Sequence, residues 1–329
     1  MTLAEPIDVL ITTAYLEPGD EVDTRLSAAG LRTRHVPDPA ALAPAERARL
    51  MSEARAVIAG TQPITAADIA AAERLEIIVR TGVGYDSVDV AAATERGVPV
   101  CITAGANRHA VAEQVFALLL ASARRLPENL ATLARGEWAQ PTGRELRGAT
   151  LGILGLGSIG KAVATIAEGF GMEVVAYDPF FDAEFAAAHG IRRAELDELL
   201  RTADFVTLHL FLDDSTRHLI DAARLRSMKS DAVIVNTARG GIVDEVALVE
   251  AVRRGEIGGA ALDVFATEPL PADSALLTTP GIIVTPHVAG ATREARRQSG
   301  LMAAQNVIET LAGNRAQFIV NPDVEGVRA

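Results

Sequence analysis

The chain has 329 residues, 49% of them hydrophobic and 22% charged, which is the balance of a globular protein large enough for two domains. Its formal net charge of −12 disfavours nucleic acid and anionic membrane surfaces as partners, because both attract basic proteins. Cys101 is the only cysteine and lies in an apolar run, so we expect a buried thiol and exclude a disulfide and a Cys-based zinc site; no metal ligand is predicted.

Two features of the sequence bear on the compartment of the protein. Residues 1–20 are acidic and contain no Lys or Arg, unlike a signal peptide. The longest apolar stretch, "VFALLLASA", is far shorter than a membrane span. We therefore expect a cytoplasmic protein without a membrane partner.

The first hundred residues predict a parallel sheet. Continuous apolar runs indicate buried strands, and helical patterns such as "EVDTRLSAAG" and "TAADIAAAERL" separate them. These runs are 7–12, 56–61, 76–82 and 98–103. Residues 109–124 then predict a long helix that is apolar on nearly every side, so we expect it to lie between domains or at a subunit interface.

The alternation of strand and helix restarts at Thr150. Six further apolar runs predict a second parallel sheet, at 150–157, 173–179, 205–210, 232–239, 259–265 and 282–288. A last amphipathic helix at 293–313 has no sheet of its own. We therefore expect this helix to pack back on the N-terminal domain.

The segment "TLGILGLGSIGKAVATIAEGFG" contains two overlapping glycine motifs. Gly155, Gly157 and Gly160 form G-x-G-x-x-G, the dinucleotide-binding fingerprint. Gly155, Gly160 and Lys161 also form most of the phosphate loop of a nucleoside triphosphatase. The phosphate loop needs a Ser or Thr after the Lys to bind Mg²⁺, and this chain has Ala162, so the triphosphatase interpretation fails.

The context of the motif supports a bound dinucleotide. A strand precedes it, a helix follows, and Asp178 ends the next strand 18 residues past Gly160 (178 − 160). Gly155 permits the turn, Gly157 lets the pyrophosphate approach the helix N-terminus, and Gly160 lets helix and strand pack closely. Asp178 binds ribose hydroxyls and repels a 2′-phosphate, which predicts NAD rather than NADP. A glycine-rich turn without a ligand is the structural alternative.

Together these elements predict two doubly wound α/β domains, each built on a parallel sheet. We expect a Rossmann NAD-binding domain at residues 104–290, inserted into a flavodoxin-like substrate domain made of residues 1–103 and 291–329.

Three later strand ends carry Arg239 in "VNTARGG", Glu268 in "DVFATEP" and His287 in "TPHVAG". Each alone has a structural explanation, as a surface or cap residue, a loop acid and a core histidine. Carboxyl ends of parallel strands meet at one edge, so the three side chains can converge near the cofactor. Hydride exchange with a 2-oxo acid needs a cation for the carboxylate, a proton donor for the carbonyl oxygen, and a carboxylate that orients the donor. Arg, His and Glu provide these in turn.

In order and spacing, "RTGVGYDSVD", "GLGSIG", "YDP", "NTARG", "LDVFATEP" and "PHVAG" closely resemble the D-isomer-specific 2-hydroxyacid dehydrogenase family. This family includes phosphoglycerate dehydrogenases, hydroxypyruvate and glyoxylate reductases, and D-lactate-type enzymes. The resemblance implies an NAD-dependent oxidoreductase that is usually a homodimer, paired through its NAD-binding domains.

The resemblance also implies roles for individual residues. The implied catalytic residues are Arg239, Glu268 and His287. The implied NAD contacts, beside the glycines, are Ser158, Ile159, Asp178, Thr237, Ala238 and Asp263. Backbone N–H groups near Val83 and Gly84 are implied to bind the substrate carboxylate.

Two departures from the family pattern affect the predicted ligand contacts. Residues 211–213 replace a proline-containing segment beside the adenosine, which leaves the contacts there open. The segment "IAGTQPIT" has no cation where phosphoglycerate enzymes commonly have an Arg for the phosphate, and Arg80 is the nearest alternative.

We therefore expect an enzyme similar to phosphoglycerate dehydrogenase, with a hydroxypyruvate or glyoxylate reductase as the alternative. A non-catalytic, corepressor-like NAD-binding protein is a second alternative, because such proteins share the fold. A formate dehydrogenase is disfavoured, because its reaction has no need of a proton-transferring Glu–His pair.

Overall fold

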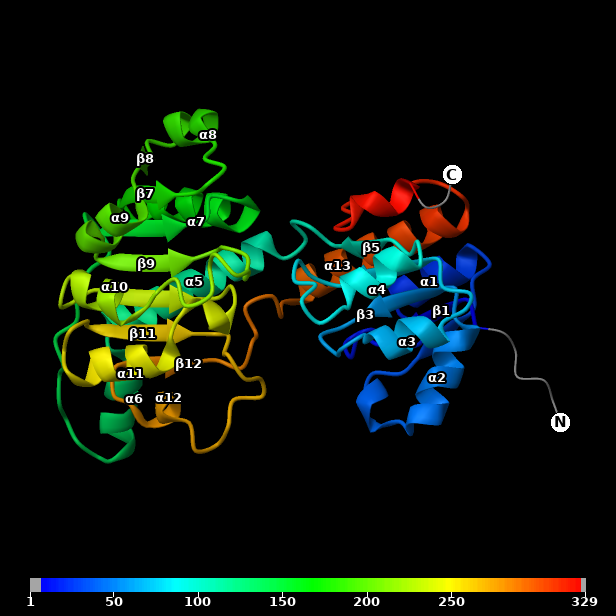
Figure 1. The fold of residues 1–329 in the computed structure, drawn as a ribbon. Helices are drawn as coiled ribbons and strands as arrows, with labels where there is room; N and C mark the ends of the chain where they lie inside the picture. Colours follow the sequence, from blue (N-terminus) through cyan, green and yellow to red (C-terminus); the bar gives the residue numbers. More distant parts are fainter. Residues whose placement is uncertain (1–6, 327–329) are drawn as a thin grey trace. The chain divides into compact units, whose positions relative to one another are not determined.

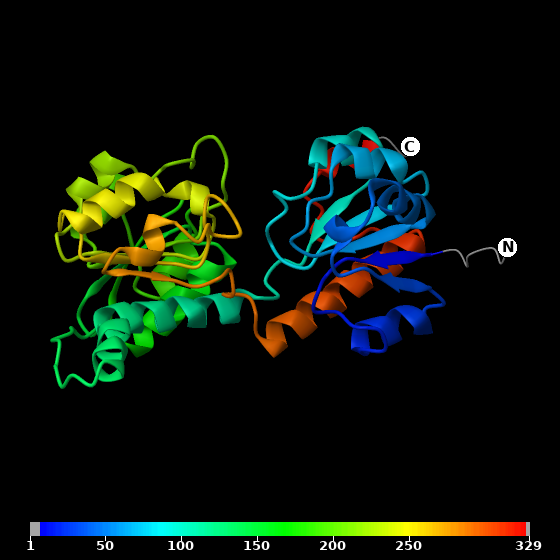
Figure 2. The same cartoon turned by 90° about the horizontal axis from the view of Figure 1, so that it is seen from below.

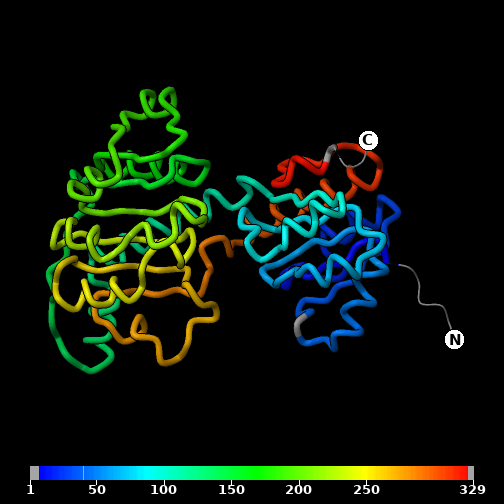
Figure 3. Tube along the Cα trace, in the orientation of Figure 1, coloured from blue at the N-terminus to red at the C-terminus, as the bar shows by residue number. Residues whose placement is uncertain are grey.

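The computed structural model describes residues 7–326 of the chain. These residues form two compact units, one made of 7–107 and 292–326 and the other of 108–291. Figure 3 traces the chain as it leaves the first unit after Asn107 and returns to it at Thr292. The sequence predicted these crossings after residues 103 and 290.

The first unit contains a five-stranded parallel sheet with the strand order β2-β1-β3-β4-β5. Its strands are β1 (Val9–Ile11), β2 (Thr33–His35), β3 (Ala56–Ala59), β4 (Ile77–Arg80) and β5 (Val100–Ile102). This order is that of flavodoxin-like folds and confirms the predicted class. The edge strand β2 was not predicted, because it reads Thr-Arg-His and has no apolar run.

Helices cover both faces of this sheet (Figure 1). They are α1 (Glu21–Ala28), η1 (Pro39–Ala41), α2 (Pro44–Glu53), α3 (Ala66–Ala71), α4 (Val90–Glu95), α13 (Arg293–Leu311) and η3 (Pro322–Gly326). Val9 and Ile11 pack against α1 and α13, whereas Leu10 between them packs in the core under α2, α3 and α4. The C-terminal helix α13 therefore belongs to the first unit, as its lack of a sheet predicted.

The second unit contains a seven-stranded parallel sheet with the order β12-β11-β10-β9-β6-β7-β8. Its strands are β6 (Thr150–Leu154), β7 (Glu173–Tyr177), β8 (Arg192–Arg193), β9 (Phe205–Leu208), β10 (Val233–Asn236), β11 (Gly259–Leu262) and β12 (Ile282–Val284). The strand order reverses beside β6, as in dinucleotide-binding folds, and confirms the predicted Rossmann class. The sequence predicted six of these strands and missed β8, an exposed two-residue edge strand.

Helices also cover both faces of the second sheet (Figure 2). They are α5 (Arg108–Ala123), α6 (Leu126–Ala134), α7 (Ser158–Gly169), α8 (Ala183–Ala188), α9 (Leu196–Thr202), α10 (Ala222–Ser227), η2 (Gly240–Ile242), α11 (Glu245–Arg253) and α12 (Ala275–Thr278). One core lies under α9, α10 and α11, and the other lies under α5 and α7.

Part of the apolar surface of α5 is covered within its own unit. Val115, Phe116 and Leu119 of this helix are buried against α7 and the sheet, and the predicted position of α5 at an interface stays a prediction. Leu120 of α5 is 37% exposed, and further exposed apolar side chains lie on the next helix and the segment after it. They are Leu126, Leu130, Leu133 and Trp138, exposed by 48%, 61%, 58% and 84%.

Cys101 is buried on β5 as a free thiol, as expected, and burial raises its pKa to about 12. This thiol is therefore protonated and unreactive at neutral pH. Among the helices of residues 7–326, none combines the length and the apolar character that a membrane span needs.

Candidate active site

The glycine loop between β6 and α7 needs glycine at two positions for steric reasons. Gly155 has φ +99°, and a Cβ there would lie 2.6 Å from the carbonyl oxygen of His209. A Cβ on Gly160 would lie 2.0 Å from the carbonyl oxygen of Gly155. The tight turn and the close contact of helix and strand therefore agree with the roles predicted for these two glycines.

Gly157 differs, because a Cβ there would meet no atom within 4 Å. This glycine precedes the first residue of α7, Ser158, and no side chain caps the helix. The helix N-terminus therefore faces open space with the N–H groups of Ser158 and Ile159 in its first turn, which is the arrangement that binds pyrophosphate. Lys161 pairs with Asp182 at 2.5 Å, which also disagrees with a triphosphatase loop.

Asp178 lies directly after β7 and fixes the geometry beside the glycine loop. Its Oδ2 accepts a hydrogen bond from Leu156 N at 2.6 Å, and its Oδ1 accepts one from Phe180 N at 2.6 Å. Each carboxylate oxygen has a further lone pair, so ribose hydroxyls can still donate to Asp178.

The turn after β10 contains an unsatisfied polar atom. The hydroxyl of Thr237 is buried and has no hydrogen-bond partner among the described residues. Next to it, Asn236 Oδ1 accepts from Ala238 N at 3.0 Å, and Asn236 Nδ2 donates to the carbonyl oxygen of Arg239 at 2.9 Å. A buried hydroxyl without a partner is costly unless a ligand completes its hydrogen bonding, so this turn also fits a bound dinucleotide.

Arg239 follows this turn and is half-buried, and its Nη1 donates to the carbonyl oxygen of Ala238 at 2.6 Å. A Cβ on the next residue, Gly240, would lie 1.9 Å from the carbonyl carbon of Phe265. The turn that carries Arg239 therefore lies directly on the segment that leads to Glu268. This role of Gly240 was not predicted, although the double glycine of "ARGG" is a signal for close backbone contact.

Glu268 and His287 form a hydrogen-bonded pair. The imidazole Nδ1 lies 2.7 Å from Oε2 of the carboxylate, while Oε1 accepts from Phe265 N at 3.0 Å. Burial raises the pKa of the Glu268 carboxyl, but the hydrogen bonds from His287 and Phe265 and the positive charges of His287 and Arg239 outweigh it. The pKa of Glu268 therefore lies below its ordinary value, and the group is a carboxylate at neutral pH.

The loop that carries His287 is fixed by Asp263 at the end of β11. The Asp263 side chain is fully buried, and its oxygens accept hydrogen bonds from Thr285 Oγ1, Val288 N and Ala289 N at 2.5, 2.9 and 2.8 Å. His287 N donates to the carbonyl oxygen of Asp263 at 2.8 Å. His287 has φ 51°, a left-handed conformation that such a network must stabilise. Asp263 thus positions the imidazole; its predicted contact with NAD stays a prediction.

In the first unit, Arg80 ends β4 and is buried. Its Nη1 donates to the carbonyl oxygen of Ala59 at 2.9 Å, and its Nε donates to that of Gly84 at 3.1 Å. The carbonyl oxygen of Gly82 accepts from Thr103 N at 3.0 Å. Because a trans peptide places C=O and N–H on opposite sides, the N–H of Val83 points away from Thr103. Arg80 therefore shapes the loop in which Val83 and Gly84 lie.

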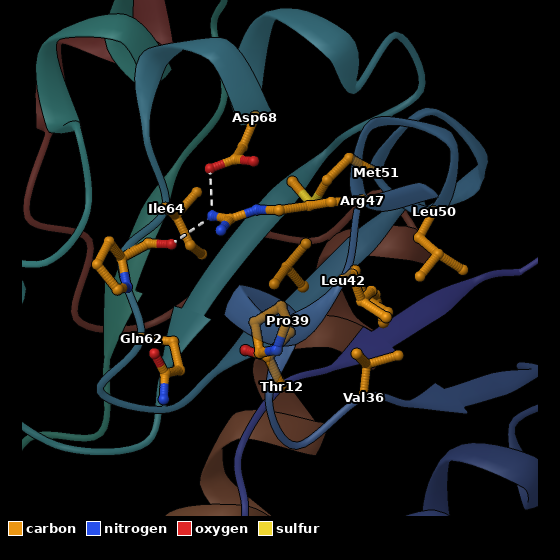
Figure 4. Close-up of a pocket in the computed structure, with 13 residues that line it drawn as sticks. Thr12, Val36, Pro39, Leu42, Arg47, Leu50, Met51, Gln62, Ile64 and Asp68 are labelled. Carbon is orange, nitrogen blue, oxygen red and sulfur yellow. Dashed lines mark hydrogen bonds and ion pairs between the residues drawn. The ribbon is translucent and has the colours of Figure 1, made fainter. Parts of the chain in front are cut away.

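The segment after β3, 60–63, is held by Arg47 of α2 (Figure 4). The Nη2 of Arg47 donates to the carbonyl oxygen of Pro63 at 2.7 Å and to Asp68 at 2.5 Å. A small pocket of about 20 Å³ lies beside it and is lined mainly by apolar side chains. The guanidinium of Arg47 is therefore already paired with a carboxylate, and residues 60–63 themselves contain no cation.

The unusual segment 211–213 forms a turn with its own hydrogen bonds. Asp213 Oδ1 accepts from Ser215 N and Thr216 N at 2.8 and 3.1 Å. Phe211 is 65% exposed, and Leu212 lies against Gly241. The side chain of Asp213 therefore stabilises this turn through hydrogen bonds to the main chain.

The comparisons with known proteins agree with this geometry. The family description "D-isomer specific 2-hydroxyacid dehydrogenase, NAD binding domain" matches residues 116–289. The chain is 44% identical to the D-3-phosphoglycerate dehydrogenase of Methanocaldococcus jannaschii over 268 residues, which are 80% of this chain and 51% of that protein. It is 41% identical to the glyoxylate reductase of Korarchaeum cryptofilum over 274 residues, 82% of each.

Among solved structures, the TT0316 protein of Thermus thermophilus superposes with a TM-score of 0.84 and 36% identity, over 95% of this chain and all of that one. The chain spans about half the length of the phosphoglycerate dehydrogenase from Methanocaldococcus jannaschii. The predicted resemblance and the predicted NAD-binding domain are confirmed. The chain belongs to the D-isomer specific 2-hydroxyacid dehydrogenase family, and residues 116–289 match the NAD binding domain of that family.

Proposed function

We propose that the protein is a cytoplasmic, NAD-dependent D-2-hydroxyacid dehydrogenase. It converts a small 2-oxo acid, NADH and a proton reversibly into the D-2-hydroxy acid and NAD⁺. The observation that carries this proposal is the contact of 2.7 Å between Glu268 and His287, with the charge of Arg239 acting on the same carboxylate.

The Glu268–His287 pair provides the proton. The carboxylate binds Nδ1 and stabilises the protonated imidazole, so Nε2 is the nitrogen that faces the substrate. His287 then gives its proton to the carbonyl oxygen during reduction and takes it back during oxidation. NADH, when bound, supplies the hydride that C2 accepts.

Several residues hold the cofactor in this proposal. The N-terminus of α7, with Ser158 and Ile159, binds the pyrophosphate beside Gly155, Gly157 and Gly160. Asp178 accepts hydrogen bonds from the adenosine ribose. Thr237, Ala238 and Asp263 would supply further contacts to NAD. The open space at Gly157 and the unpartnered hydroxyl of Thr237 support this placement.

Arg239 and the loop after β4 hold the substrate. The guanidinium binds the carboxylate and polarises the carbonyl group, which a planar cation with several donors does well. The backbone N–H groups of Val83 and Gly84 bind the same carboxylate. Arg80 contributes by holding the carbonyl oxygen of Gly84.

We propose a phosphoglycerate dehydrogenase-like activity, since that name accompanies the relative at 44% identity. The alternative is a hydroxypyruvate or glyoxylate reductase. It is favoured by the match to 82% of the length of the glyoxylate reductase from Korarchaeum cryptofilum.

NADH oxidation by the purified protein at neutral pH tests the function. The substrates are 3-phosphohydroxypyruvate, hydroxypyruvate, glyoxylate, pyruvate and a branched 2-oxo acid. Oxidation of NADH with one or more of them supports the proposal. The preferred acid distinguishes a phosphoglycerate dehydrogenase-like activity from a hydroxypyruvate or glyoxylate reductase. Tight binding of NADH without oxidation in all five reactions contradicts it and favours the corepressor-like alternative.

We also propose that the protein is a homodimer paired through α6. Leu130 and Leu133 are both more than half exposed on this helix, and Trp138 follows it. An exposed apolar patch of this kind is typical of a protein interface. Light scattering should give twice the mass of the chain for the wild type and the mass of one chain for Leu130→Glu/Leu133→Glu. A monomeric wild type contradicts this assembly.

A further inference from the structure

A second group of polar side chains lies in the first unit, at the edge where its strands end. Thr13 and Tyr15 follow β1, Thr81 follows β4, and Arg296 and Ser299 belong to α13. The hydroxyl oxygens of Thr13 and Thr81 lie 3.2 Å apart. Residues distant in the sequence thus form one cluster at the carboxyl ends of the strands, where open α/β sheets bind ligands.

Tyr15 is the centre of this cluster. Burial raises the pKa of its phenol, and hydrogen bonds from Thr81 and Ser299 and the charges of Arg296 and Arg80 offset only part of that effect. The phenol is therefore neutral at neutral pH and can donate a hydrogen bond to a ligand.

The packing of α13 places Arg296 over Tyr15. The guanidinium carbon lies 5.1 Å from the centroid of the phenol ring, within the range of a cation–π contact. Gly300 lies one turn further on the same face of the helix. A Cβ there would lie 2.7 Å from Val22 and 3.0 Å from Leu16, so only glycine allows the helix to lie this close.

Arg296 has a charge that no acidic side chain neutralises. It is exposed and forms no ion pair within residues 7–326, whereas its neighbour Arg297 donates two hydrogen bonds of 2.6 Å to Glu21. A guanidinium that packs over a neutral phenol is suited to an anion, whereas the Thr81 hydroxyl beside them donates to the carbonyl oxygen of Ala59 at 3.2 Å. Thr81 begins the loop that contains Val83 and Gly84, so this position adjoins the proposed carboxylate site.

We propose that Arg296, together with Tyr15, recognises an anionic terminus on the carbon chain of the 2-oxo acid. The terminus is a phosphate monoester or a carboxylate. This inference rests on the proposed function and makes Arg296 the residue that determines specificity. It replaces Arg80 as the cation for the distal group, because Arg80 is buried and donates to main-chain carbonyl groups.

The test compares Arg296→Gln with wild type on three 2-oxo acids. 3-Phosphohydroxypyruvate and 2-oxoglutarate have an anionic terminus, and hydroxypyruvate has a neutral one. The wild type should prefer one of the two anionic acids, which identifies the terminus. For that acid, kcat/KM should fall about ten-fold or more in the variant, mainly through KM, as expected for a lost charge-assisted hydrogen bond. The value for hydroxypyruvate should change about two-fold or less.

Arg297→Gln is the matched control, because it removes the same charge from the adjacent position. It should leave all three kcat/KM values within about two-fold of wild type, and the Kd for NADH should be unchanged in both variants. Arg296→Lys keeps the charge but loses the planar fork, so it should retain part of the preference. If Arg296→Gln does not fold, the preference of Arg296→Lys for the anionic acid tests the role of Arg296 instead.

Two results overturn the inference while the proposed function stands. One is a wild type that prefers hydroxypyruvate, and the other is an equal loss of kcat/KM on all three acids in Arg296→Gln. A wild type that reduces no 2-oxo acid overturns the proposed function itself, and the inference with it.

Discussion

The Nδ1 atom of His287 lies 2.7 Å from Oε2 of Glu268, and the main-chain N–H of the same histidine donates to Asp263 O at 2.8 Å. One acidic residue therefore orients the imidazole, and another fixes the backbone from which it extends. Both come from the segment that follows β11. The proton donor is thus positioned before any substrate binds, which reduces the reorganisation that catalysis requires.

Replacing Glu268 with Gln should change the pH dependence of reduction. The pKa of Glu268 lies below its ordinary value, so its carboxylate acts on His287 throughout the neutral range and is lost only as the pH falls through that lowered pKa. Without the carboxylate, the protonated imidazole is less stable. The alkaline limb of kcat/KM for reduction should therefore move to lower pH.

Glu245→Gln is the control for this pH profile. This carboxylate accepts from Ala266 N at 2.6 Å and makes no described hydrogen bond to His287, so a smaller displacement is expected. An unchanged profile in Glu268→Gln would count against the pairing of Glu268 with the proton donor.

Alanine at Gly157 and at Gly160 should affect two different properties of the protein, the affinity for NADH and the stability of the fold. Gly157→Ala adds a Cβ in open space, so stability should be unchanged, but the pyrophosphate can no longer approach and the Kd for NADH should rise at least about ten-fold. Gly160→Ala forces a Cβ to within 2.0 Å of Gly155 O and should destabilise the fold by about 1–3 kcal/mol. Urea unfolding and NADH fluorescence measure the two effects.

Gly169→Ala provides the matched control in the same helix, because a Cβ there meets no atom within 4 Å. It should leave both quantities near those of wild type. Wild-type affinity in Gly157→Ala would show that the helix N-terminus does not hold the cofactor.

Thr237→Val should separate a ligand-binding role from a structural one. The buried hydroxyl has no described partner, so its removal should leave the Tm of the protein without NADH unchanged or raise it. The Kd for NADH should rise about three- to ten-fold. Thr279→Val is the contrast, because that hydroxyl donates to Ala275 O at 2.7 Å and its loss should lower Tm without affecting NADH. A lowered Tm with unchanged affinity in Thr237→Val would refute the assignment.

Asp178→Asn should weaken the discrimination between NADH and NADPH. The substitution removes the charge that repels a 2′-phosphate, so the ratio of the two dissociation constants should fall about ten-fold. Asp182→Asn is the control, since this neighbouring acid pairs with Lys161. Fluorescence titration with both cofactors gives the ratio, and an unchanged ratio in Asp178→Asn would remove Asp178 from the ribose site.

The strands that could be predicted from the sequence are those that consist of a continuous apolar run. The strands β6 and β11 are buried on both faces, so their residues had to be apolar. Strands β2 and β8 were missed because each lies at a sheet edge, where polar residues such as Thr33 and Arg192 meet solvent. Burial therefore determines which strands a single sequence reveals.

The residues of the candidate site could also be predicted only in part from the sequence. Arg239, Glu268 and His287 were found because their chemistry is distinctive and because each follows a strand. Arg80 also has a distinctive side chain at the end of a strand. The local sequence pattern could not show that its guanidinium donates hydrogen bonds to main-chain carbonyl groups. Arg296 and Tyr15 are far apart in the sequence, so their contact depends on tertiary packing that no local motif encodes.

In the proposed function, this chain transfers a hydride from NADH to C2 of a 2-oxo acid. The most direct test uses NADH deuterated at the transferred position of C4, with a mixture of the five 2-oxo acids named above. Chiral chromatography and mass spectrometry then identify the 2-hydroxy acids formed. We expect a D-2-hydroxy acid with one deuterium at C2 or, if glyoxylate is the substrate, glycolate with one deuterium at C2, and neither product in the His287→Ala reaction. A product of L configuration, or NADH binding without any deuterated hydroxy acid, would contradict it.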